Sequence, residues 1–253
     1  MPNLSHPQGP LALLIAIILF TATGCQPAAL SRETSPAPTS TADAGYAQAR
    51  NRMVEEQIMA RGVEDEAVLS AMRAVPRHAF VPDKYLSQAY ADHPLPIGHG
   101  QTISQPYIVA LMSAELDVSQ GDRVLEVGTG SGYQAAVLAE MGLEVYTVEI
   151  IPELASQAED ALQQAGYDDM ALLNTDGYFG WKEHAPYDAI IVTAAPDHLP
   201  QPLVRQLEEG GNLVIPIGPI GAVQTLWRYE KVDGEIQATN LGSVKFVPLT
   251  GEH

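Results

Sequence analysis

Residues 123–139 read RVLEVGTGSGYQAAVLA, and this stretch decides the fold that the sequence predicts. Its apolar beginning, residues 123–127, is typical of a short buried strand. Gly128, Gly130 and Gly132 follow and lead into a helical pattern. Glycine has no Cβ, so such a loop lets backbone N–H groups approach a ligand closely. A strand, a glycine-rich loop and a helix in this order predict a site for a nucleotide-like cofactor.

The spacing of the glycines distinguishes between cofactor classes. A dinucleotide-binding G-x-G-x-x-G loop would need a glycine at position 133, where this chain has Tyr133. That mismatch disfavours an NAD-dependent oxidoreductase. The observed G-x-G-x-G spacing, with Glu126 two residues before the first glycine, is typical of Rossmann-like S-adenosylmethionine methyltransferases.

Acidic residues at the ends of the next two predicted strands favour a nucleoside site. Glu149 ends the second strand, where we expect it to accept hydrogen bonds from both ribose hydroxyls. Asp176 and Gly177 follow the third strand, beside the expected adenine. The alternative is a glycine-rich surface turn with unrelated carboxylates nearby.

Downstream of the glycine loop, strand and helix patterns alternate, which predicts a mostly parallel, doubly wound α/β sheet of the Rossmann-like type. A run of strand patterns alone follows, which predicts antiparallel strands at the C-terminal edge. The expected strands are residues 123–127, 144–149, 170–173, 187–192, 212–217, 224–229, 235–241 and 244–247, and the expected helices are 132–141, 152–165 and 203–207.

Upstream of the glycine loop, the pattern predicts an N-terminal helical extension. One amphipathic helix is expected over residues 46–61, and a second runs from Glu64 to the proline at position 76. Residues 81–105 are punctuated by proline and glycine, which is typical of a loop. Pro106 can begin a third helix, which we expect to run to about residue 116.

Composition limits the classes of partner. The chain has 253 residues, of which 46% are hydrophobic, so it can bury a substantial core. Its formal net charge of −18 repels a phosphate backbone, so we expect no nucleic-acid partner. Cys25 is its one cysteine, which excludes an internal disulfide and a zinc site built from several thiolates.

The first 45 residues follow a different pattern. Residues 11–20, LALLIAIILF, have the length of a signal-peptide core and are shorter than a membrane span. The sequence ATGC that ends at Cys25 resembles the bacterial lipobox, in which the cysteine is lipidated. We therefore expect a signal peptide at 1–24, a tether at 25–45 and a globular domain at 46–253. The protein would then be lipid-anchored in the cell envelope and face the periplasm.

Two alternatives stay open for this segment. A buried N-terminal helix would explain the apolar run, although residues 26–41 are rich in Pro, Ser and Thr and offer little to pack. A start at Met53 would remove the segment and make the protein cytoplasmic.

Seven stretches between about Tyr46 and the end of the chain closely resemble the protein-L-isoaspartate O-methyltransferase family. They are MVEEQIMARGV (53–63), VPRHAFVP (75–82), AYADHPLPIGHGQTISQPYIVA (89–110), LEVGTGSGYQAAVLA (125–139), DGYFGWKEHAPYDAIIVTAA (176–195), GGNLVIPIG (210–218) and FVPLTG (246–251). The glycine loop is shared with many methyltransferases, whereas PLPIGHGQTISQP with VPRHAFVP upstream is specific to this family. Nothing in the family resembles residues 1–45, and its members are usually cytoplasmic.

The resemblance implies transfer of a methyl group from S-adenosylmethionine to the free α-carboxylate of L-isoaspartyl residues in damaged proteins. The ester then closes to a succinimide, which partly reopens to aspartate. The implied partners are isoaspartyl-containing proteins and peptides, and we expect a monomer that needs no metal. Ser104 matches the active-site serine of the family, and we expect it to position the substrate rather than attack it. The implied cofactor-binding residues are Thr102, Ile103, Ser104, Glu126, Gly128, Gly130, Gly132, Glu149, Asp176, Gly177 and Thr250.

Other interpretations of the conspicuous residues stay open. A Ser-His-Asp hydrolase would need a G-x-S-x-G elbow, which the sequence around Ser104 does not match. Ser104 could also cap the helix that Pro106 begins. His78, His93 and His99 lack the spacing of metal ligands, which favours loop or packing roles. A catalytically silent envelope protein that keeps the methyltransferase fold is the remaining alternative.

Overall fold

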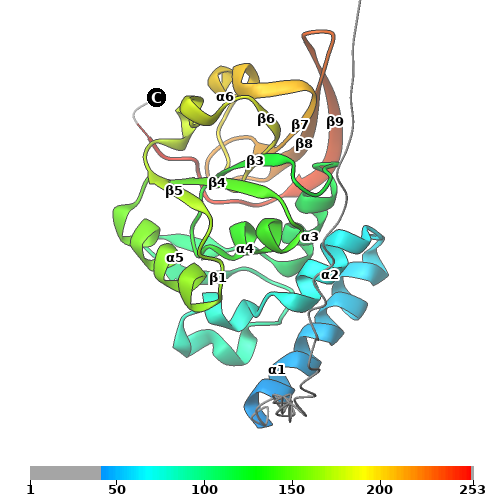
Figure 1. Cartoon of the computed structure of the whole chain (residues 1–253), viewed down its shortest axis with the longest axis vertical. Coiled ribbons are helices and arrows are strands. Elements are labelled where there is room, and N and C mark those ends of the chain that lie inside the picture. Colours follow the sequence, from blue (N-terminus) through cyan, green and yellow to red (C-terminus); the bar gives the residue numbers. More distant parts are fainter. Residues whose placement is uncertain (1–40, 252–253) are drawn as a thin grey trace, which may run out of the picture. The chain divides into compact units, whose positions relative to one another are not determined.

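Within residues 41–251, the part of the chain that the computed structural model describes, seven strands form one sheet in the order β5-β4-β3-β6-β7-β8-β9 (Figure 1). The strands are β3 (Arg123–Val127), β4 (Glu144–Glu149), β5 (Ala171–Asn174), β6 (Tyr187–Val192), β7 (Leu207–Ile217), β8 (Gln224–Val232) and β9 (Glu235–Val244). Strands β3 to β7 pair in parallel, whereas the β7–β8 and β8–β9 pairs are antiparallel. The predicted doubly wound α/β sheet with an antiparallel C-terminal edge is therefore confirmed.

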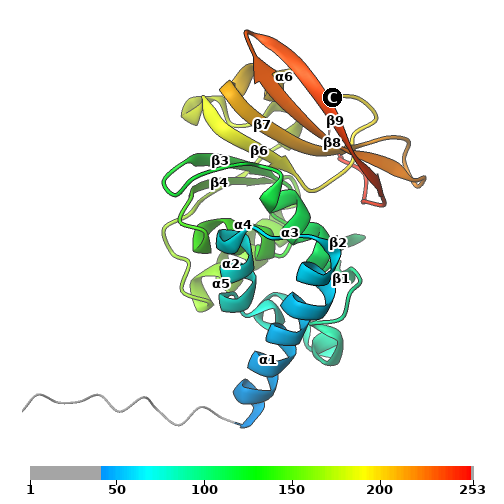
Figure 2. The ribbon, with the colours of Figure 1, turned by 90° about the vertical axis from the view of Figure 1, so that its right-hand side faces the viewer.

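Helices cover both faces of the sheet (Figure 2). The helices are α2 (Glu66–Ala74), α3 (Pro106–Ala114), α4 (Tyr133–Glu140) and α5 (Pro152–Gln164) on one face and α6 (Gln201–Gln206) on the other. Successive strand residues point to opposite faces. Val124 packs into the core beneath α2–α5, and its neighbour Leu125 packs into a second core with Leu203 of α6. Both faces are therefore buried, which explains why apolar residues occur on both faces of the central strands instead of alternating with exposed polar ones.

The N-terminal helical extension begins earlier than the sequence predicted. Helix α1 (Thr41–Arg52) continues without a break into η1 (Met53–Ile58) and η2 (Met59–Arg61). It ends at Gly62, whose φ of 91° is the left-handed conformation of a helix C-terminus, as expected. Residues 41–45, which the sequence analysis placed at the end of the tether, are helical. These residues, TADAG, contain two alanines and no proline, in contrast to the proline-rich residues before them.

Helix α2 has the boundaries that its capping residues dictate. The Asp65 side chain accepts a hydrogen bond from the Val68 backbone N–H at 2.9 Å, and the helix stops two residues before Pro76. None of the helices in the described part of the chain is long and apolar enough to cross a lipid bilayer.

Residues 81–105 are not the simple loop that the prolines and glycines suggested. They contain the 3₁₀ helix η4 (Asp83–Gln88), which follows η3 (Arg77–Phe80), and a hairpin of β1 (Leu95–Gly98) and β2 (Gln101–Ile103). Leu95 and Ile103 face each other across this hairpin, and both are buried. The buried hairpin thus positions Ser104, which follows it, beside the glycine loop of the large sheet.

The largest differences from the predicted strand boundaries are in β7 and β9. Strand β7 begins at Leu207 rather than at residue 212, because the chain pairs with β6 on both sides of an irregularity opposite residues 187–189. The two strands expected at 235–241 and 244–247 are one strand, β9, that ends at Val244. The chain then leaves the sheet, and Pro248 forms an isolated parallel bridge with Ala195. This return brings the C-terminal segment to the carboxyl ends of the parallel strands.

Candidate active site

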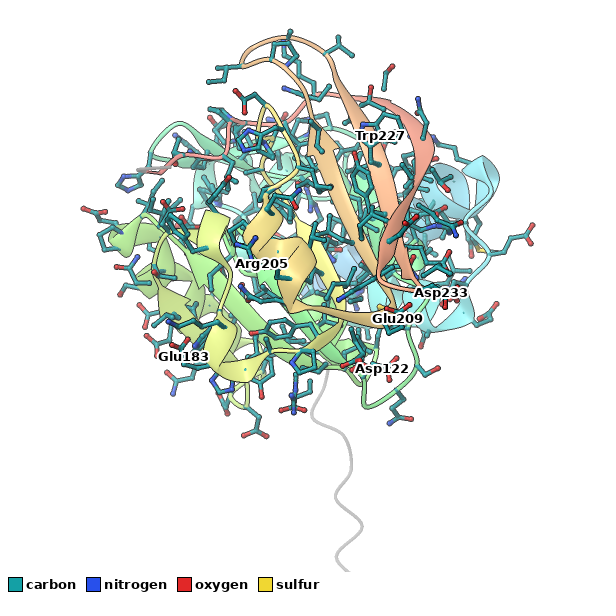
Figure 3. The ribbon with its side chains drawn as sticks, turned by 90° about the horizontal axis from the view of Figure 1, so that it is seen from above. Asp122, Glu183, Arg205, Glu209, Trp227 and Asp233 are labelled. Carbon is teal, nitrogen blue, oxygen red and sulfur yellow. The ribbon has the colours of Figure 1, made fainter. Side chains whose placement is uncertain are left out.

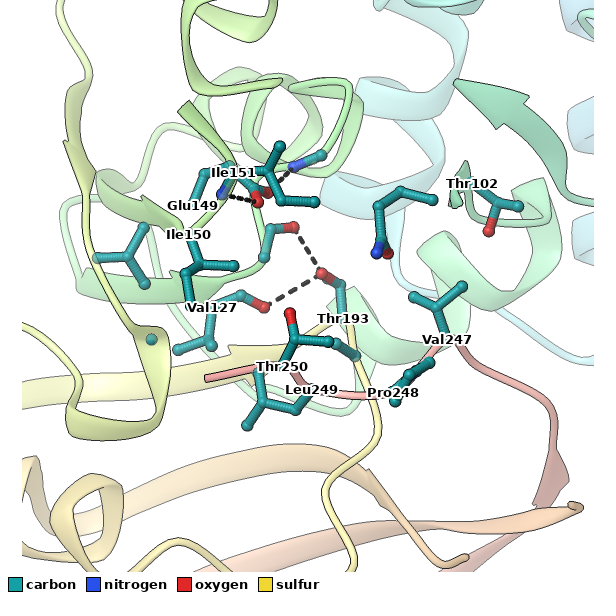
Figure 4. Close-up of a pocket in the computed structure, with 16 residues that line it drawn as sticks. Thr102, Val127, Glu149, Ile150, Ile151, Thr193, Val247, Pro248, Leu249 and Thr250 are labelled. Atoms are coloured by element: carbon teal, nitrogen blue, oxygen red, sulfur yellow. Dashed lines mark hydrogen bonds between the residues drawn. The ribbon is translucent and has the colours of Figure 1, made fainter. Parts of the chain in front are cut away.

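The glycine loop between β3 and α4 is crowded on one side by Thr193, the residue that follows β6. Gly128 has a φ of 98°, and a Cβ added there would lie 2.5 Å from the Thr193 Oγ1 atom. The same hydroxyl donates to the Gly128 carbonyl at 2.6 Å and to the Val127 carbonyl at 3.1 Å (Figure 4). Position 128 therefore requires glycine for its backbone conformation and for its space.

The other two glycines of the loop have different surroundings. A Cβ at Gly132 would press against the Leu162 side chain at 3.0 Å, so this glycine lets α4 pack against α5. A Cβ at Gly130 would lie 3.5 Å from Ile97, which is an ordinary contact. The constraint at Gly130 is its positive φ of 54°, not a lack of space.

Glu149, at the carboxyl end of β4, holds the glycine loop in place. Its Oε2 atom accepts a hydrogen bond from the Gly130 N–H at 2.8 Å, and its Oε1 atom accepts one from the Ile151 N–H at 2.9 Å (Figure 4). A carboxylate offers about four lone-pair positions. The two remaining positions can accept the ribose hydroxyls that the sequence analysis assigned to Glu149.

Glu126 is a fully buried carboxyl group beside the loop. Its Oε2 atom accepts a hydrogen bond from the Thr147 hydroxyl at 2.5 Å, whereas its Oε1 atom has no partner among the described residues. Burial raises the pKa of Glu126 to about 8, and the negative charge of Glu149 adds to this rise against the opposing Thr147 bond. A buried carboxyl with one unpaired oxygen fits a ligand that brings a cationic group.

Most of the predicted cofactor-binding residues line one connected region at the carboxyl ends of the strands. One cavity is lined by Thr102, Gly128, Gly130, Glu149, Gly177 and Thr250, and a second is lined by Thr102, Ile103, Ser104, Glu126, Gly128 and Gly130. The two cavities share Thr102, both glycines and Thr193. A Cβ at Gly177 would lie 2.5 Å from the Val127 side chain, so glycine is needed in that wall as well.

Two predicted residues lie beside these cavities rather than in their lining. Gly132 belongs to the start of α4, as described above. The Asp176 carboxylate accepts a hydrogen bond from the Tyr178 N–H at 3.0 Å and caps η5 (Gly177–Phe179), which precedes η6 (Lys182–His184). Asp176 therefore stabilises the turn that places Gly177 in the lining of the first cavity.

Ser104 follows β2 and lines both the cavity beside Glu126 and a wide groove on the outer side. The N-cap position of α3 is Gln105, whose side chain makes no capping hydrogen bond, so Ser104 is not the N-cap residue of α3. The Ser104 backbone carbonyl accepts a hydrogen bond at 2.7 Å from the guanidinium of Arg77. Its hydroxyl makes no hydrogen bond within residues 41–251 and so is available to a ligand.

Arg77 and Thr193 are site residues that the sequence analysis missed. Arg77 is fully buried, donates to the Ala89 and Ser104 carbonyls at 2.8 and 2.7 Å, and burial lowers its pKa to about 10. It therefore holds the serine segment through the backbone. Thr193 could have been found from sequence, because it directly follows a parallel strand, where binding residues gather.

The three histidines that raised a metal hypothesis lie in packing and turn positions. His78 stacks on Tyr46 at 3.9 Å between ring centroids, and its Nδ1 atom lies 2.7 Å from the Tyr90 hydroxyl. His99 lies in the β1–β2 turn with a φ of 50°, and the His93 Nδ1 atom lies 3.0 Å from the next residue's carbonyl. No cluster of three or more His, Cys, Asp or Glu in the described residues could hold a metal ion.

The sheet order, the glycine loop and the acidic residues at the strand ends define a Rossmann-like S-adenosylmethionine-dependent methyltransferase. A family model described as protein-L-isoaspartate(D-aspartate) O-methyltransferase matches residues 48–253. The chain therefore belongs to the protein-L-isoaspartate O-methyltransferase family. This membership confirms the predicted activity and the predicted cofactor.

Individual relatives agree with the family match. Protein-L-isoaspartate O-methyltransferases of Picosynechococcus sp. and Gloeobacter violaceus are each 56% identical, and the matches cover 80% and 79% of this chain and 90% and 98% of theirs. A Plasmodium falciparum structure described as a protein-L-isoaspartate O-methyltransferase in complex with S-adenosyl-L-homocysteine is 27% identical, with a TM-score of 0.68. That match covers 79% of this chain and 98% of the solved one. Another solved protein-L-isoaspartate O-methyltransferase is 29% identical with a TM-score of 0.73, and this chain spans 66% of its length.

The burial of Glu126 predicts that cofactor affinity depends on pH. Only the ionised carboxylate attracts a cationic ligand, and the pKa of about 8 leaves most of Glu126 protonated at pH 6. Binding of the cationic amino group should therefore release a proton, and affinity should rise with pH, by up to about tenfold per pH unit, until pH 8. Calorimetry with S-adenosylhomocysteine in buffers of different ionisation enthalpy measures both effects. The Glu126→Gln variant should bind more weakly with a flat pH profile, and a flat profile in the unaltered protein would contradict this role.

Proposed function

We propose that this chain methylates the free α-carboxylate of L-isoaspartyl residues beside Ser104, where the cavity next to Glu126 meets the wide outer groove. The observation that carries this proposal is that Ser104, Thr102 and Thr193 line both the cavity beside Glu126 and the wide outer groove. A cofactor held on the glycine loop and a polypeptide held in the groove would then meet at these three hydroxyls. The methyl ester would close to a succinimide, which starts the repair of the damaged residue.

The main contribution that this reaction requires from the protein is the positioning of the reacting groups. S-adenosylmethionine supplies, when bound, an electrophilic methyl group on a sulfonium. The acceptor carboxylate is ionised at neutral pH, so no strong general base is needed. The Ser104 hydroxyl donates a hydrogen bond to this carboxylate without forming a competing ion pair. Holding the reacting groups in line accounts for most of the expected acceleration.

The cofactor would be held by groups whose geometry suits its parts. Gly128 and Gly130, which line both cavities, would let the backbone approach it, Glu126 would pair with its amino group, and Glu149 would accept its ribose hydroxyls. Thr250 and Gly177 would close the adenine side of the cavity. The buried, unpaired Oε1 atom of Glu126 supports this assignment, because an apolar ligand would leave it unsatisfied.

Two matched peptides test the proposed function. One contains an L-isoaspartyl residue, the other contains aspartate at the same position, and both are incubated with methyl-labelled S-adenosylmethionine. We expect base-labile label in the isoaspartyl peptide alone. Equal labelling of both peptides, or no labelling by a protein that binds S-adenosylhomocysteine, would contradict the proposal.

We also propose that the enzyme is a lipoprotein of the cell envelope, with the domain facing the periplasm. The segment that supports this, with the ten apolar residues 11–20 and Cys25 after small residues, lies outside the described residues. A residue that carries more than one acyl chain anchors a domain to a membrane without a spanning helix. The enzyme would then meet aged envelope proteins, whereas a cytoplasmic location, usual in the family, is the alternative.

Replacing the cysteine tests this location. We expect Cys25→Ser to abolish labelling with palmitate and to move the protein from the membrane fraction to the soluble fraction. Mass spectrometry of the unaltered protein should find residues 1–24 removed. An unaltered protein that is soluble, unprocessed and cytoplasmic would contradict the lipoprotein proposal.

A further inference from the structure

The groove on the outer side of Ser104 is large enough for a polypeptide segment. Its volume is about 770 Å³, and its walls come from η2, α3 and the end of β9 with the residues that follow. Tyr107, Ile108, Leu111 and Val244 supply apolar surface. The groove thus combines an apolar floor with the serine that we assign to the acceptor carboxylate.

The charged residues of this groove all have the same sign. Arg61 and Lys245 line it, and no Asp or Glu among the described residues does. This composition is unusual for this chain, which has 31 acidic and 13 basic residues. A region lined by cations and by no acidic side chain is less negative than the rest of such a protein's surface.

The two cations differ in how firmly they are held. The Arg61 guanidinium lies over the Tyr107 ring, 3.4 Å from its centroid, and pairs with Asp92 at 3.1 Å, which offsets part of its charge. Lys245 is exposed, and none of the ion pairs within residues 41–251 includes it. Lys245 is therefore the cation that can pair with an incoming carboxylate.

Several acidic side chains lie at the end of the sheet away from the groove. Asp122 directly precedes β3, and Glu183 lies in η6, shortly before β6, so both lie toward the amino ends of these strands. Glu209 accepts hydrogen bonds from the Gly234 N–H in the β8–β9 turn, beside Asp233 (Figure 3). Ser104 and Lys245 belong to the opposite, carboxyl ends of the strands. An acidic segment is therefore less strongly repelled at the groove than at the end of the sheet that carries these acidic residues.

We propose that the groove selects isoaspartyl sites flanked by acidic residues, and that Lys245 sets this preference. The inference rests on the proposed function, because the groove is its substrate site. Exposed ion pairs are weak, so the expected preference is modest, about two- to tenfold in kcat/KM. Salt should reduce it, because exposed charges are screened.

Three isoaspartyl peptides that differ only in the two residues next to the isoaspartate test the inference. These residues are Glu in one peptide, Gln in the second and Lys in the third. We expect kcat/KM to fall in that order at low salt and the three values to converge at high salt. The Lys245→Gln variant should lose most of the difference between the Glu and Lys peptides.

Lys182→Gln is the matched control, because it changes the net charge equally. Lys182 is 82% exposed, pairs with Glu183 at 3.9 Å and does not line the groove. This variant should keep the full preference. Equal kcat/KM for all three peptides, or equal loss of preference in both variants, would overturn the inference and leave the proposed function standing. Failure to methylate any peptide would overturn the proposed function, and this inference with it.

Discussion

Ser104→Ala is expected to slow methylation of an isoaspartyl peptide by about 10- to 1000-fold, the range for the loss of one preorganised hydrogen-bond donor. The hydroxyl is lost, but the backbone bond from Arg77 to the Ser104 carbonyl stays, so the segment should keep its place. S-adenosylhomocysteine should bind with nearly unchanged affinity, because the glycine loop and Glu149 are untouched. Rates with saturating peptide and cofactor, together with calorimetry, separate these two effects.

The Ser104→Thr variant is the control for the chemical group. It keeps a hydroxyl at the same position and should recover part of the lost rate. Full activity of Ser104→Ala would remove the serine from the mechanism. Equal loss in both variants would assign the effect to packing around β2 instead of to a hydrogen bond.

The central strands could be predicted from sequence because their environment is uniform. Strands β3, β4 and β6 have the predicted boundaries, since each is a short apolar run buried on both faces. The β1–β2 hairpin could not be predicted in the same way, because its prolines and glycines are also typical of a loop. Its apolar residues are buried against a core formed by distant parts of the chain, and the local sequence does not reveal these contacts.

The same distinction applies to the candidate site. The glycines, Glu126 and Glu149 follow strands in a local pattern that the sequence displays. Arg77 acts on Ser104 across 27 positions, and Thr193 acts on Gly128 across 65 positions. Thr193 could be noticed as a residue that follows a strand, but no local pattern connects the two members of either pair, so these contacts emerge only from the folded chain.

Gly128→Ala is expected to weaken S-adenosylhomocysteine binding by about 30- to 150-fold. The new Cβ would lie 2.5 Å from the Thr193 Oγ1 atom, and this hydroxyl must then release the Val127 and Gly128 carbonyls. The single hydroxyl proton is shared between the two carbonyls, so its loss costs about 1 kcal/mol. A non-glycine residue at this positive φ costs a further 1–2 kcal/mol, roughly. Because the loop must return to its present shape to hold the cofactor, these costs appear in the affinity.

A second glycine separates the clash from the backbone strain. Gly121 has a φ of 91°, close to the 98° of Gly128, but a Cβ there would meet nothing within 4 Å, and the residue lies outside both cavities. Gly121→Ala should therefore lose about 1–2 kcal/mol of folding stability in a denaturant titration and bind the cofactor normally. Gly128→Ala should lose stability and affinity together. Wild-type affinity in a folded Gly128→Ala protein would mean that the cofactor does not rest on this loop.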